Sequence, residues 1–357
     1  MSIFPVSTIV RSPGNGLLTF TSGSGKALKF LKSHFGEAAM KDWQTVLPAK
    51  LKAQSGPFSI LGFPSDCGGG ICRGTAHGPL HLRKKLYDDH PDWASRDLGD
   101  VPCVPHLLHD TMISDRQREL SGKALWADAF EDGVPVSPLS LLEELLVELY
   151  QTVPNFRPLV LGGDHSTAGA IFEALYRSDR LKTCAVLQFD AHTDLLESRF
   201  GVENCFATWT ANAIRHMPDP QRFVQIGIRA SGHSKEHWES KFGLRQHWAK
   251  DLLSLDPEQY AVELVADLKS KGCDCLYISN DIDGTDEQYA PSTGTPESGG
   301  MSPAWVTKVI EVCTSELKLI GADMVEVAPV LGSPDDGELT VATAAKIIDA
   351  HRWIQEA

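Results

Sequence analysis

The sequence predicts an α/β protein with one doubly wound, mostly parallel sheet and helices on both of its faces. Short, nearly continuous apolar runs alternate with longer amphipathic stretches, which is the order of successive βαβ units. Runs of this kind are typical of strands that are buried on both faces. Pro-, Gly- or Ser-rich linkers, internal repeats and low-complexity tracts are absent from the sequence. These observations favour a single sheet over two separate domains.

Six strands and seven helices are expected in alternation. The predicted strands are Phe58–Phe63, Pro158–Gly162, Cys184–Asp190, Phe223–Ile228, Cys275–Asp281 and Leu317–Val327. The predicted helices are Pro79–Asp88, Ser140–Tyr150, Ala168–Ser178, Thr208–His216, Pro257–Lys271, Pro303–Glu316 and Leu339–Ile354. In the second helix, leucines between Leu141 and Leu149 recur on one face and form an apolar stripe.

Residues 1–55 precede the first predicted strand, and we interpret them as an N-terminal extension to a domain that spans residues 56–357. The extension contains SGSGK (Ser22–Lys26), which invites comparison with a phosphate-binding P-loop. That motif requires a glycine where Phe20 stands and a Ser or Thr where Ala27 stands. We therefore expect a loop that leads into a helix at Lys29–His34.

Composition excludes several classes of protein. The 357 residues include 33 Lys and Arg against 47 Asp and Glu, which gives a net charge of −14. Without a basic run the chain lacks the charge that nucleic-acid binding requires, so no nucleic-acid partner is expected. Neither a membrane-spanning apolar stretch nor a signal-peptide pattern appears, so a cytoplasmic location is expected. The eight cysteines show no Cys-x-x-Cys pair and are expected to be reduced thiols.

Ionisable residues follow three of the predicted strands. They form the motifs GGDHS (Gly162–Ser166), DAHTD (Asp190–Asp194) and SNDID (Ser279–Asp283). In an open parallel sheet, ligands bind in the crevice beyond the carboxyl ends of the strands, where all three motifs would lie. Side chains of an extended chain alternate with a period of two, so the aspartates and histidine of DAHTD point the same way, as do the last two aspartates of SNDID.

The convergence of these side chains predicts a metal site. The candidate ligands are His165, Asp190, His192, Asp194, Asp281 and Asp283. This oxygen and nitrogen set without thiolate suits Mn(II) best and leaves Ni, Fe, Co or Zn open, and six ligands exceed what one zinc ion takes. If Asp190 and Asp281 each bridge, two ions roughly 3.5–4 Å apart share the set. An EF-hand calcium loop that begins at Asp281 is excluded, because its glycine, Gly284, comes too early in the loop and Ser292 stands where the loop requires a glutamate.

The three motifs, together with APSTGTPESGG (Ala290–Gly300), closely resemble the signatures of the ureohydrolase superfamily, which includes arginase, agmatinase and formimidoylglutamase. The resemblance extends from about Gly62 to the C-terminus and includes DLGD (Asp97–Asp100), IGIR and MVEVAP (Met324–Pro329). It implies a three-layer α/β/α arginase-like fold, with residues 56–357 as the catalytic domain.

The resemblance also implies roles for individual residues. Two Mn(II) ions per chain would be held, one by His165, Asp190, Asp194 and Asp281, the other by Asp190, His192, Asp281 and Asp283. Asp194 is expected to orient the hydroxide that attacks the substrate and to carry its proton to the leaving amine. Glu326 is expected to pair with the guanidinium or amidinium of the substrate.

One loop departs from the family pattern. Arginases and agmatinases carry a histidine 10–13 residues after DAHTD, whereas Leu195–Trp209 contains none. Asn204 and Cys205 stand near the expected place and are candidate substrate contacts. The aspartate that arginases carry after IGIR is also missing, so L-arginine is disfavoured. Formimidoylglutamases lack the loop histidine. Its absence here therefore favours a formimidoylglutamase-like activity or an unusual guanidino substrate.

These observations predict a binuclear manganese-dependent hydrolase that cleaves a C–N bond of a linear guanidino or formimidoyl compound and releases urea or formamide. Two alternatives remain open, a single-zinc deacetylase of the same fold and a non-catalytic, metal-binding family member. The expected partner is a small guanidino or amidino substrate. The resemblance further implies a homo-oligomer, either a trimer or a hexamer.

Overall fold

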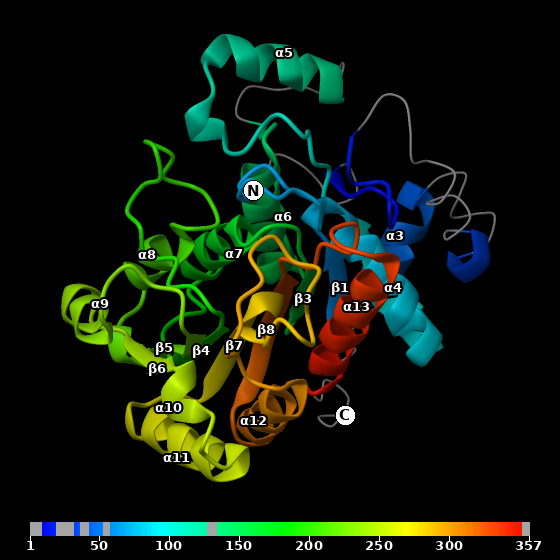
Figure 1. The fold of residues 1–357 in the computed structure, drawn as a ribbon. Helices are drawn as coiled ribbons and strands as arrows, with labels where there is room; N and C mark the ends of the chain where they lie inside the picture. The colour runs from blue at the N-terminus through cyan, green and yellow to red at the C-terminus, as the bar shows by residue number, and fades with distance from the viewer. Residues whose placement is uncertain (1–8, 19–31, 36–42, 53–57, 127–133, 352–357) are drawn as a thin grey trace.

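The computed structural model describes residues 9–18, 32–35, 43–52, 58–126 and 134–351, and its centre is an eight-stranded sheet (Figure 1). The strand order is β2-β1-β3-β8-β7-β4-β5-β6, and every neighbouring pair is parallel. The strands are β1 (Ser59–Gly62), β2 (Asp97–Asp100), β3 (Pro158–Leu161), β4 (Cys184–Phe189), β5 (Phe223–Ile228), β6 (Arg245–Trp248), β7 (Cys275–Asp281) and β8 (Lys318–Val325). The predicted parallel sheet is confirmed, but it has eight strands rather than the six predicted, because the two edge strands β2 and β6 contain few apolar residues.

Helices cover both faces of the sheet and complete three layers (Figure 1). One layer contains α3 (Trp43–Lys52), α6 (Pro138–Thr152), α7 (Ser166–Arg177), α8 (Trp209–Ile214) and α9 (Lys235–Phe242). The other contains α4 (Gly78–Asp89), α10 (Ala249–Leu252), α11 (Pro257–Ser270), α12 (Pro303–Glu316) and α13 (Pro334–Asp349). A further helix, α5 (Asp115–Trp126), is mostly exposed. Short 3-10 helices are η1 (Thr75–His77), η2 (Pro91–Arg96), η3 (Asp110–Met112), η5 (Pro220–Arg222) and η6 (Ile282–Gly284).

Two apolar cores follow from the alternation of side chains along each strand. Val160 and Val186 pack with α6 and α7 on one face. Their neighbours Leu161 and Leu187 pack with helices of the opposite layer. Because both faces are buried, the central strands read as continuous apolar runs, which is the pattern that predicted them.

The observed boundaries differ from the predicted ones mainly at helix starts. Helix α13 begins at Pro334 rather than Leu339, because Ser333 and Asp336 form a capping box that starts the helix earlier. Residues 352–354 of that predicted helix lie outside the described residues. Of the predicted helix at 29–34, residues 32–35 are helical and residues 29–31 also lie outside the described part.

Part of the N-terminal extension covers one edge of the sheet. Arg11 forms an antiparallel bridge with Asp100 of edge strand β2, through Arg11 N to Asp100 O at 2.7 Å and Asp100 N to Arg11 O at 2.8 Å. The buried Arg83 guanidinium lies 2.5 Å from Asp100 Oδ1 and 2.7 Å from Asp97 Oδ2. Gly14 N donates to the other oxygen of Asp100 at 2.8 Å. These contacts pair an edge that would otherwise be open.

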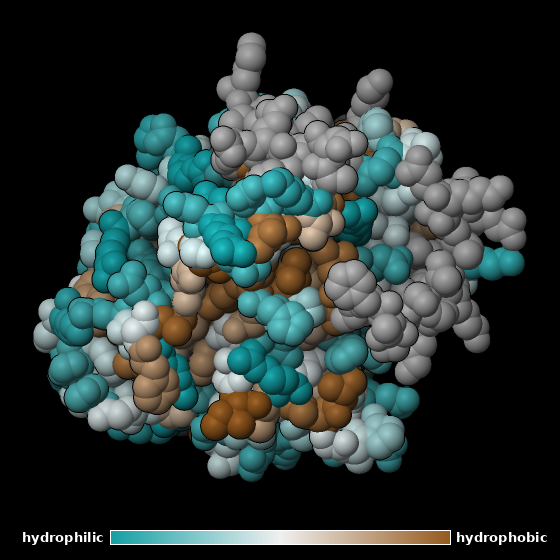
Figure 2. Space-filling view, turned by 90° about the horizontal axis from the view of Figure 1, so that it is seen from above, coloured by the Kyte–Doolittle hydropathy of each residue, from teal (hydrophilic) through white to brown (hydrophobic). Residues whose placement is uncertain are grey.

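The carboxyl ends of the strands form the face that Figure 2 shows from above. Apolar surface, drawn in brown, gathers toward the middle of this face, and hydrophilic surface lies to its left (Figure 2). Two loops that follow strands on this side carry the most exposed large apolar side chains, Ile71 (95% exposed) and Phe200 (99% exposed). All eight cysteines are free, as expected. In the described part of the chain, no helix is long and apolar enough to cross a membrane.

Candidate metal centre

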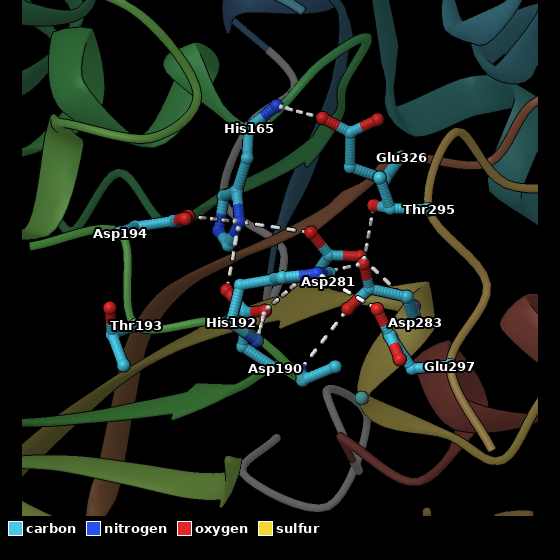
Figure 3. A network of polar contacts seen from close by, with 12 residues as sticks. His165, Asp190, His192, Thr193, Asp194, Asp281, Asp283, Thr295, Glu297 and Glu326 are labelled. Carbon is cyan, nitrogen blue, oxygen red and sulfur yellow. Dashed lines mark hydrogen bonds and ion pairs between the residues drawn. The ribbon is translucent and has the colours of Figure 1, made fainter. Parts of the chain in front are cut away.

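Four neighbouring strands in the middle of the sheet deliver the predicted site residues to one place (Figure 3). His165 follows β3, DAHTD follows β4, Asp281 ends β7 and Glu326 follows β8. The structure brings all six candidate ligands together, as the position of the three motifs at strand ends predicts.

The backbone around the site is unusually constrained. Asp194 and Glu326 adopt left-handed conformations, with φ of 50° and 59°. Such values cost energy in residues other than glycine and are often found at functional sites. Hydrogen bonds hold both, from Ala211 N to Asp194 O at 3.3 Å and from Glu326 N to Gly163 O at 2.9 Å. Gly163 itself has no room for a side chain, because a Cβ there would lie 1.6 Å from Ser65 O.

The first group of ligands surrounds His165. Its Nδ1 lies 3.2 Å from Asp190 Oδ2, 3.2 Å from Asp194 Oδ2 and 3.1 Å from Asp281 Oδ2. All four side chains are buried. Three carboxylate oxygens thus converge on one imidazole nitrogen.

The second group surrounds His192 and shares Asp190 with the first. His192 Nδ1 lies 3.0 Å from Asp283 Oδ2 and 3.6 Å from Asp190 Oδ1. Its other nitrogen lies 3.6 Å from Glu297 Oε1. Two sets of residues could each hold a metal ion: one is His165, Asp190 and Asp194, and the other is Asp190, His192 and Asp283. Within each set, the potential ligand atoms lie within 4.8 Å of one another. Asp190 therefore faces the first group with one oxygen and the second group with the other.

Hydrogen bonds fix the tautomer of His165. Ser279 Oγ donates to Asp323 Oδ1 at 2.9 Å, so it accepts from His165 Nε2–H, which is 3.1 Å away. Nδ1 is then the ring nitrogen directed at the three carboxylate oxygens, and this buried atom has no hydrogen-bond partner. Three carboxylates this close to one nitrogen repel one another unless a positive charge, either a proton on Nδ1 or a metal ion, lies between them. The donor set therefore fits a metal ion.

The buried carboxylates of the site carry an excess of negative charge that bound cations would neutralise. Burial and the charge of Asp190 raise the pKa of Asp194 to about 6. Burial and the charges of Asp283 and Asp190 raise the pKa of Asp281 well above its ordinary value. Burial lowers the pKa of His165, but its three carboxylate neighbours outweigh this and raise it well above the ordinary value. Among the described residues, no Lys or Arg forms an ion pair with the four aspartates, so the acidic excess lacks a counterion of the protein's own.

Glu326 lies beside the first group of ligands. Its Oε1 accepts a hydrogen bond from His165 N at 2.8 Å (Figure 3). Burial and the charges of Asp281 and Asp164 raise the pKa of its carboxyl well above the ordinary value. A guanidinium or amidinium ion at this position would stabilise the ionised form.

Asn204 and Cys205, the candidate substrate contacts, lie on a different side. They line a cavity of about 360 Å³ together with Ser166 and Trp209, and none of the six candidate ligands lines this cavity. Burial raises the pKa of the Cys205 thiol, so the thiol form is favoured there. Their contact with substrate stays a prediction.

Several residues that support the site were not predicted from the sequence. Trp209 Nε1 donates to Asp194 Oδ2 at 2.8 Å, and Gln188 Nε2 donates to Asp190 Oδ2 at 2.7 Å. Thr295 Oγ1 donates to Asp283 Oδ2 at 3.2 Å. Gln188 and Ser279 stand two residues before Asp190 and Asp281, so the period of two could have placed them beside those ligands. No such signal marks Trp209, which the chain brings back from a separate helix.

Comparison with known proteins agrees with this geometry. A family model described as "Arginase family" matches residues 57–351. The chain belongs to the arginase family. This arginase-family chain is 31% identical over 292 residues to guanidinobutyrase of Pseudomonas aeruginosa, with 79% of this chain and 81% of the relative covered. It is 35% identical over 295 residues to the mitochondrial agmatinase of Gallus gallus, with 80% and 77% covered.

Solved structures confirm the fold of this arginase-family chain. Formimidoylglutamase from Bacillus subtilis matches with a TM-score of 0.66 at 20% identity and covers 84% of this chain and 87% of its own. Arginase from Bacillus subtilis matches with a TM-score of 0.65 at 24% identity and covers 83% and 98%. The predicted arginase-like fold and the predicted enzyme class, a ureohydrolase, are both confirmed.

Proposed function

We propose that this chain is a binuclear hydrolase that cleaves the guanidino C–N bond of a small linear substrate and releases urea, with Mn(II) as its metal. The observation that carries the proposal is that Asp190 belongs to two ligand groups, one around each histidine. The sequence relatives favour a guanidino over a formimidoyl substrate, because they are named guanidinobutyrase, agmatinase and guanidinopropionase. At 20% identity, the likeness to the formimidoylglutamase structure shows the fold and does not indicate the substrate.

The chain's own residues would hold two metal ions. His165, Asp190, Asp194 and Asp281 would hold one, and Asp190, His192, Asp281 and Asp283 the other. When bound, such a pair acidifies water and supplies a nucleophile at neutral pH. The backbone hydrogen bonds to the aspartates, such as Asp283 N to Asp281 Oδ1 at 2.9 Å, hold the ligands in place before any metal arrives.

Glu326 and Asp194 would act on the substrate. Glu326 faces the first ligand group with a buried carboxyl group, which suits pairing with a guanidinium that enters above the sheet. Asp194 lies on the side of His165, where its carboxylate can orient the attacking group and pass a proton to the leaving amine. Asn204 and Cys205 stay candidate contacts for the far end of the substrate.

A product assay tests the proposal. Protein loaded with Mn(II), and separately with Ni(II), is incubated with agmatine, guanidinobutyrate, guanidinopropionate, guanidine, arginine and formimidoylglutamate, and urea and formamide are measured. We expect urea from a guanidino compound and about two metal ions per chain by elemental analysis. About one zinc per chain without urea would instead support the deacetylase alternative. Bound metal without any product would support a non-catalytic member. A cytoplasmic location and a trimer or hexamer stay predictions, the latter testable by light scattering.

A further inference from the structure

A row of buried polar side chains crosses the sheet directly beneath the metal centre. Its members are register partners on five adjacent strands, and each is wholly buried: Gln246 on β6, Gln225 on β5, Gln188 on β4, Ser279 on β7 and Asp323 on β8. We call this set the polar row. Apolar side chains fill most of the neighbouring positions, and burying a polar group is unfavourable unless it is hydrogen-bonded.

The three glutamines form a hydrogen-bonded ladder with one direction. Gln246 Nε2 donates to Gln225 Oε1 at 2.7 Å, and Gln225 Nε2 donates to Gln188 Oε1 at 2.8 Å. Gln188 Nε2 then donates to Asp190 Oδ2 at 2.7 Å. At the other end, Trp248 Nε1 donates to Gln246 Oε1 at 3.0 Å. The indole can only donate and the ionised carboxylate can only accept, so the two ends together fix the orientation of every amide between them.

The other half of the polar row reaches the other key ligand. Asp323 Oδ1 accepts from Ser279 Oγ, which lies 3.1 Å from His165 Nε2. Tyr277 holds the second oxygen of Asp323 through a hydrogen bond of 2.9 Å. This half therefore keeps His165 Nδ1 directed toward the carboxylates.

The ladder also determines how Asp190 presents its two oxygens. Oδ2 accepts from Gln188 and lies 3.2 Å from His165 Nδ1. Oδ1 accepts from His192 N at 2.6 Å and lies 3.6 Å from His192 Nδ1. With one hydrogen bond on each oxygen, the carboxylate cannot rotate without losing both, so each oxygen stays directed toward one ligand group.

We propose that the polar row positions the metal centre through its two halves: the glutamine ladder holds Asp190 in its ligating orientation from edge strand β6 inward, and Ser279 with Asp323 holds His165. The inference rests on the proposed binuclear site. Gln188, Gln225 and Gln246 are positioning residues, because they act through Asp190 rather than on the substrate. Hydrogen bonds in such a chain polarise one another, so a break at the far end weakens the last link.

Two single variants and their double variant test the proposal through metal binding. Gln188→Met breaks the link to Asp190, and Gln246→Met breaks the ladder at β6, away from any ligand. Metal-free proteins are titrated with Mn(II), and the electron paramagnetic resonance signal of a coupled manganese pair is recorded. We expect Gln188→Met to weaken Mn(II) binding by about 10–100-fold, the usual effect of losing a partner of a metal ligand. Gln246→Met should weaken it several-fold, and the double variant should be no weaker than Gln188→Met alone.

Ser140→Ala is the matched control. Asp110 N donates to Ser140 Oγ at 3.1 Å, so this substitution removes a buried hydrogen bond that shares no partner with the polar row. It should lower thermal stability and leave Mn(II) affinity unchanged. If Gln246→Met does not fold, Trp248→Phe removes the first donor of the ladder instead. It tests in the same way whether a break at β6 weakens the hydrogen bond from Gln188 to Asp190.

The outcomes separate this inference from the proposed function. Unchanged Mn(II) affinity in Gln188→Met, or a loss confined to that variant with none in the β6 variants, would overturn the claim that the glutamine ladder positions Asp190 from β6 inward. A wild-type protein that binds two Mn(II) ions but turns over no substrate would defeat the proposed function and leave this test intact, because the test reads metal binding alone.

Discussion

Trp209 and Asp194 are joined by a hydrogen bond of 2.8 Å, from the indole N–H to the carboxylate oxygen that also lies 3.2 Å from His165 Nδ1. The indole ring packs against the His165 ring, with centroids 4.7 Å apart and planes tilted by 40°. Phe172 and Phe223 hold the indole from other sides, at 5.6 and 5.9 Å. One buried side chain therefore positions two predicted ligands at once.

Trp209→Phe should remove the hydrogen bond while keeping most of the ring packing. We expect kcat to fall by about 10–100-fold with a smaller change in KM, since losing a partner of a metal ligand costs this much in activity or metal affinity. Steady-state kinetics and metal analysis measure both. Trp238→Phe is the matched control, because that indole donates to Ser231 Oγ at 2.9 Å, outside the metal centre. Equal kinetics for the two variants would contradict the positioning role of Trp209.

Much of this candidate metal centre could be predicted because its candidate ligands are local in sequence. The motifs around Asp190 and Asp281 follow strands that read as apolar runs, and the period of two places their carboxylates on one side. The parallel order of the sheet then brings the strand ends together. The two edge strands were not predicted. Strands β2 (DLGD) and β6 (RQHW) contain few apolar residues, and the acids of β2 are buried only because Arg83 pairs with them.

The supporting contacts depend on packing that no local pattern contains. Trp209 reaches Asp194 only because α8 packs against α7, and Gln246 reaches Gln225 only because β6 pairs with β5. The sequence placed Asn204 and Cys205 near the substrate from their distance to Asp194 along the chain, and the structure shows that they line a cavity beside the metal centre. Their contact with substrate stays a prediction.

Asp190→Asn should remove metal and activity together, because Asp190 belongs to both ligand groups and faces each with a different oxygen. An amide keeps the shape but supplies only one oxygen for two ions. We expect fewer than two metal ions per chain by elemental analysis and a loss of urea release. Asp256→Asn is the control, since Asp256 Oδ1 caps α11 through Gln259 N at 2.9 Å and asparagine caps a helix equally well. Two retained metal ions in Asp190→Asn would contradict the bridging assignment.

Glu326→Gln should separate substrate binding from metal binding. The amide oxygen can still accept the hydrogen bond from His165 N, so the left-handed turn and both metal ions should persist. Losing the charge that faces a substrate cation should lower kcat/KM by about 100-fold, since removing one partner of a buried charge pair costs 2–5 kcal/mol or more. Kinetics with the best guanidino substrate, alongside metal analysis, measure this. Unchanged kinetics would exclude the proposed role of Glu326.

His351 should make the stability of the fold depend on pH. This buried histidine follows α13, and its Nδ1 lies 2.9 Å from Ile348 O. Its Nε2 lies 3.2 Å from Asn280 Nδ2, so Nε2 accepts and Nδ1–H donates, which describes a neutral ring. Burial lowers its pKa from 6.5 to about 4, against the opposing effect of the backbone carbonyls at 347 and 348.

The sign of the effect follows from where the proton binds. Between pH 6.5 and about 4 the unfolded chain takes up a proton at His351 that the folded protein does not, so stability is full above pH 6.5 and falls as the pH decreases. At about 1.4 kcal/mol for each pH unit, this histidine should account for about 3 kcal/mol over that interval. Urea unfolding of wild type and His351→Gln, both in chelator so that metal loss does not contribute, should show a shallower pH dependence in the variant. The slopes are compared rather than the absolute stabilities, because glutamine packs differently, and parallel curves would show that His351 is not the group responsible.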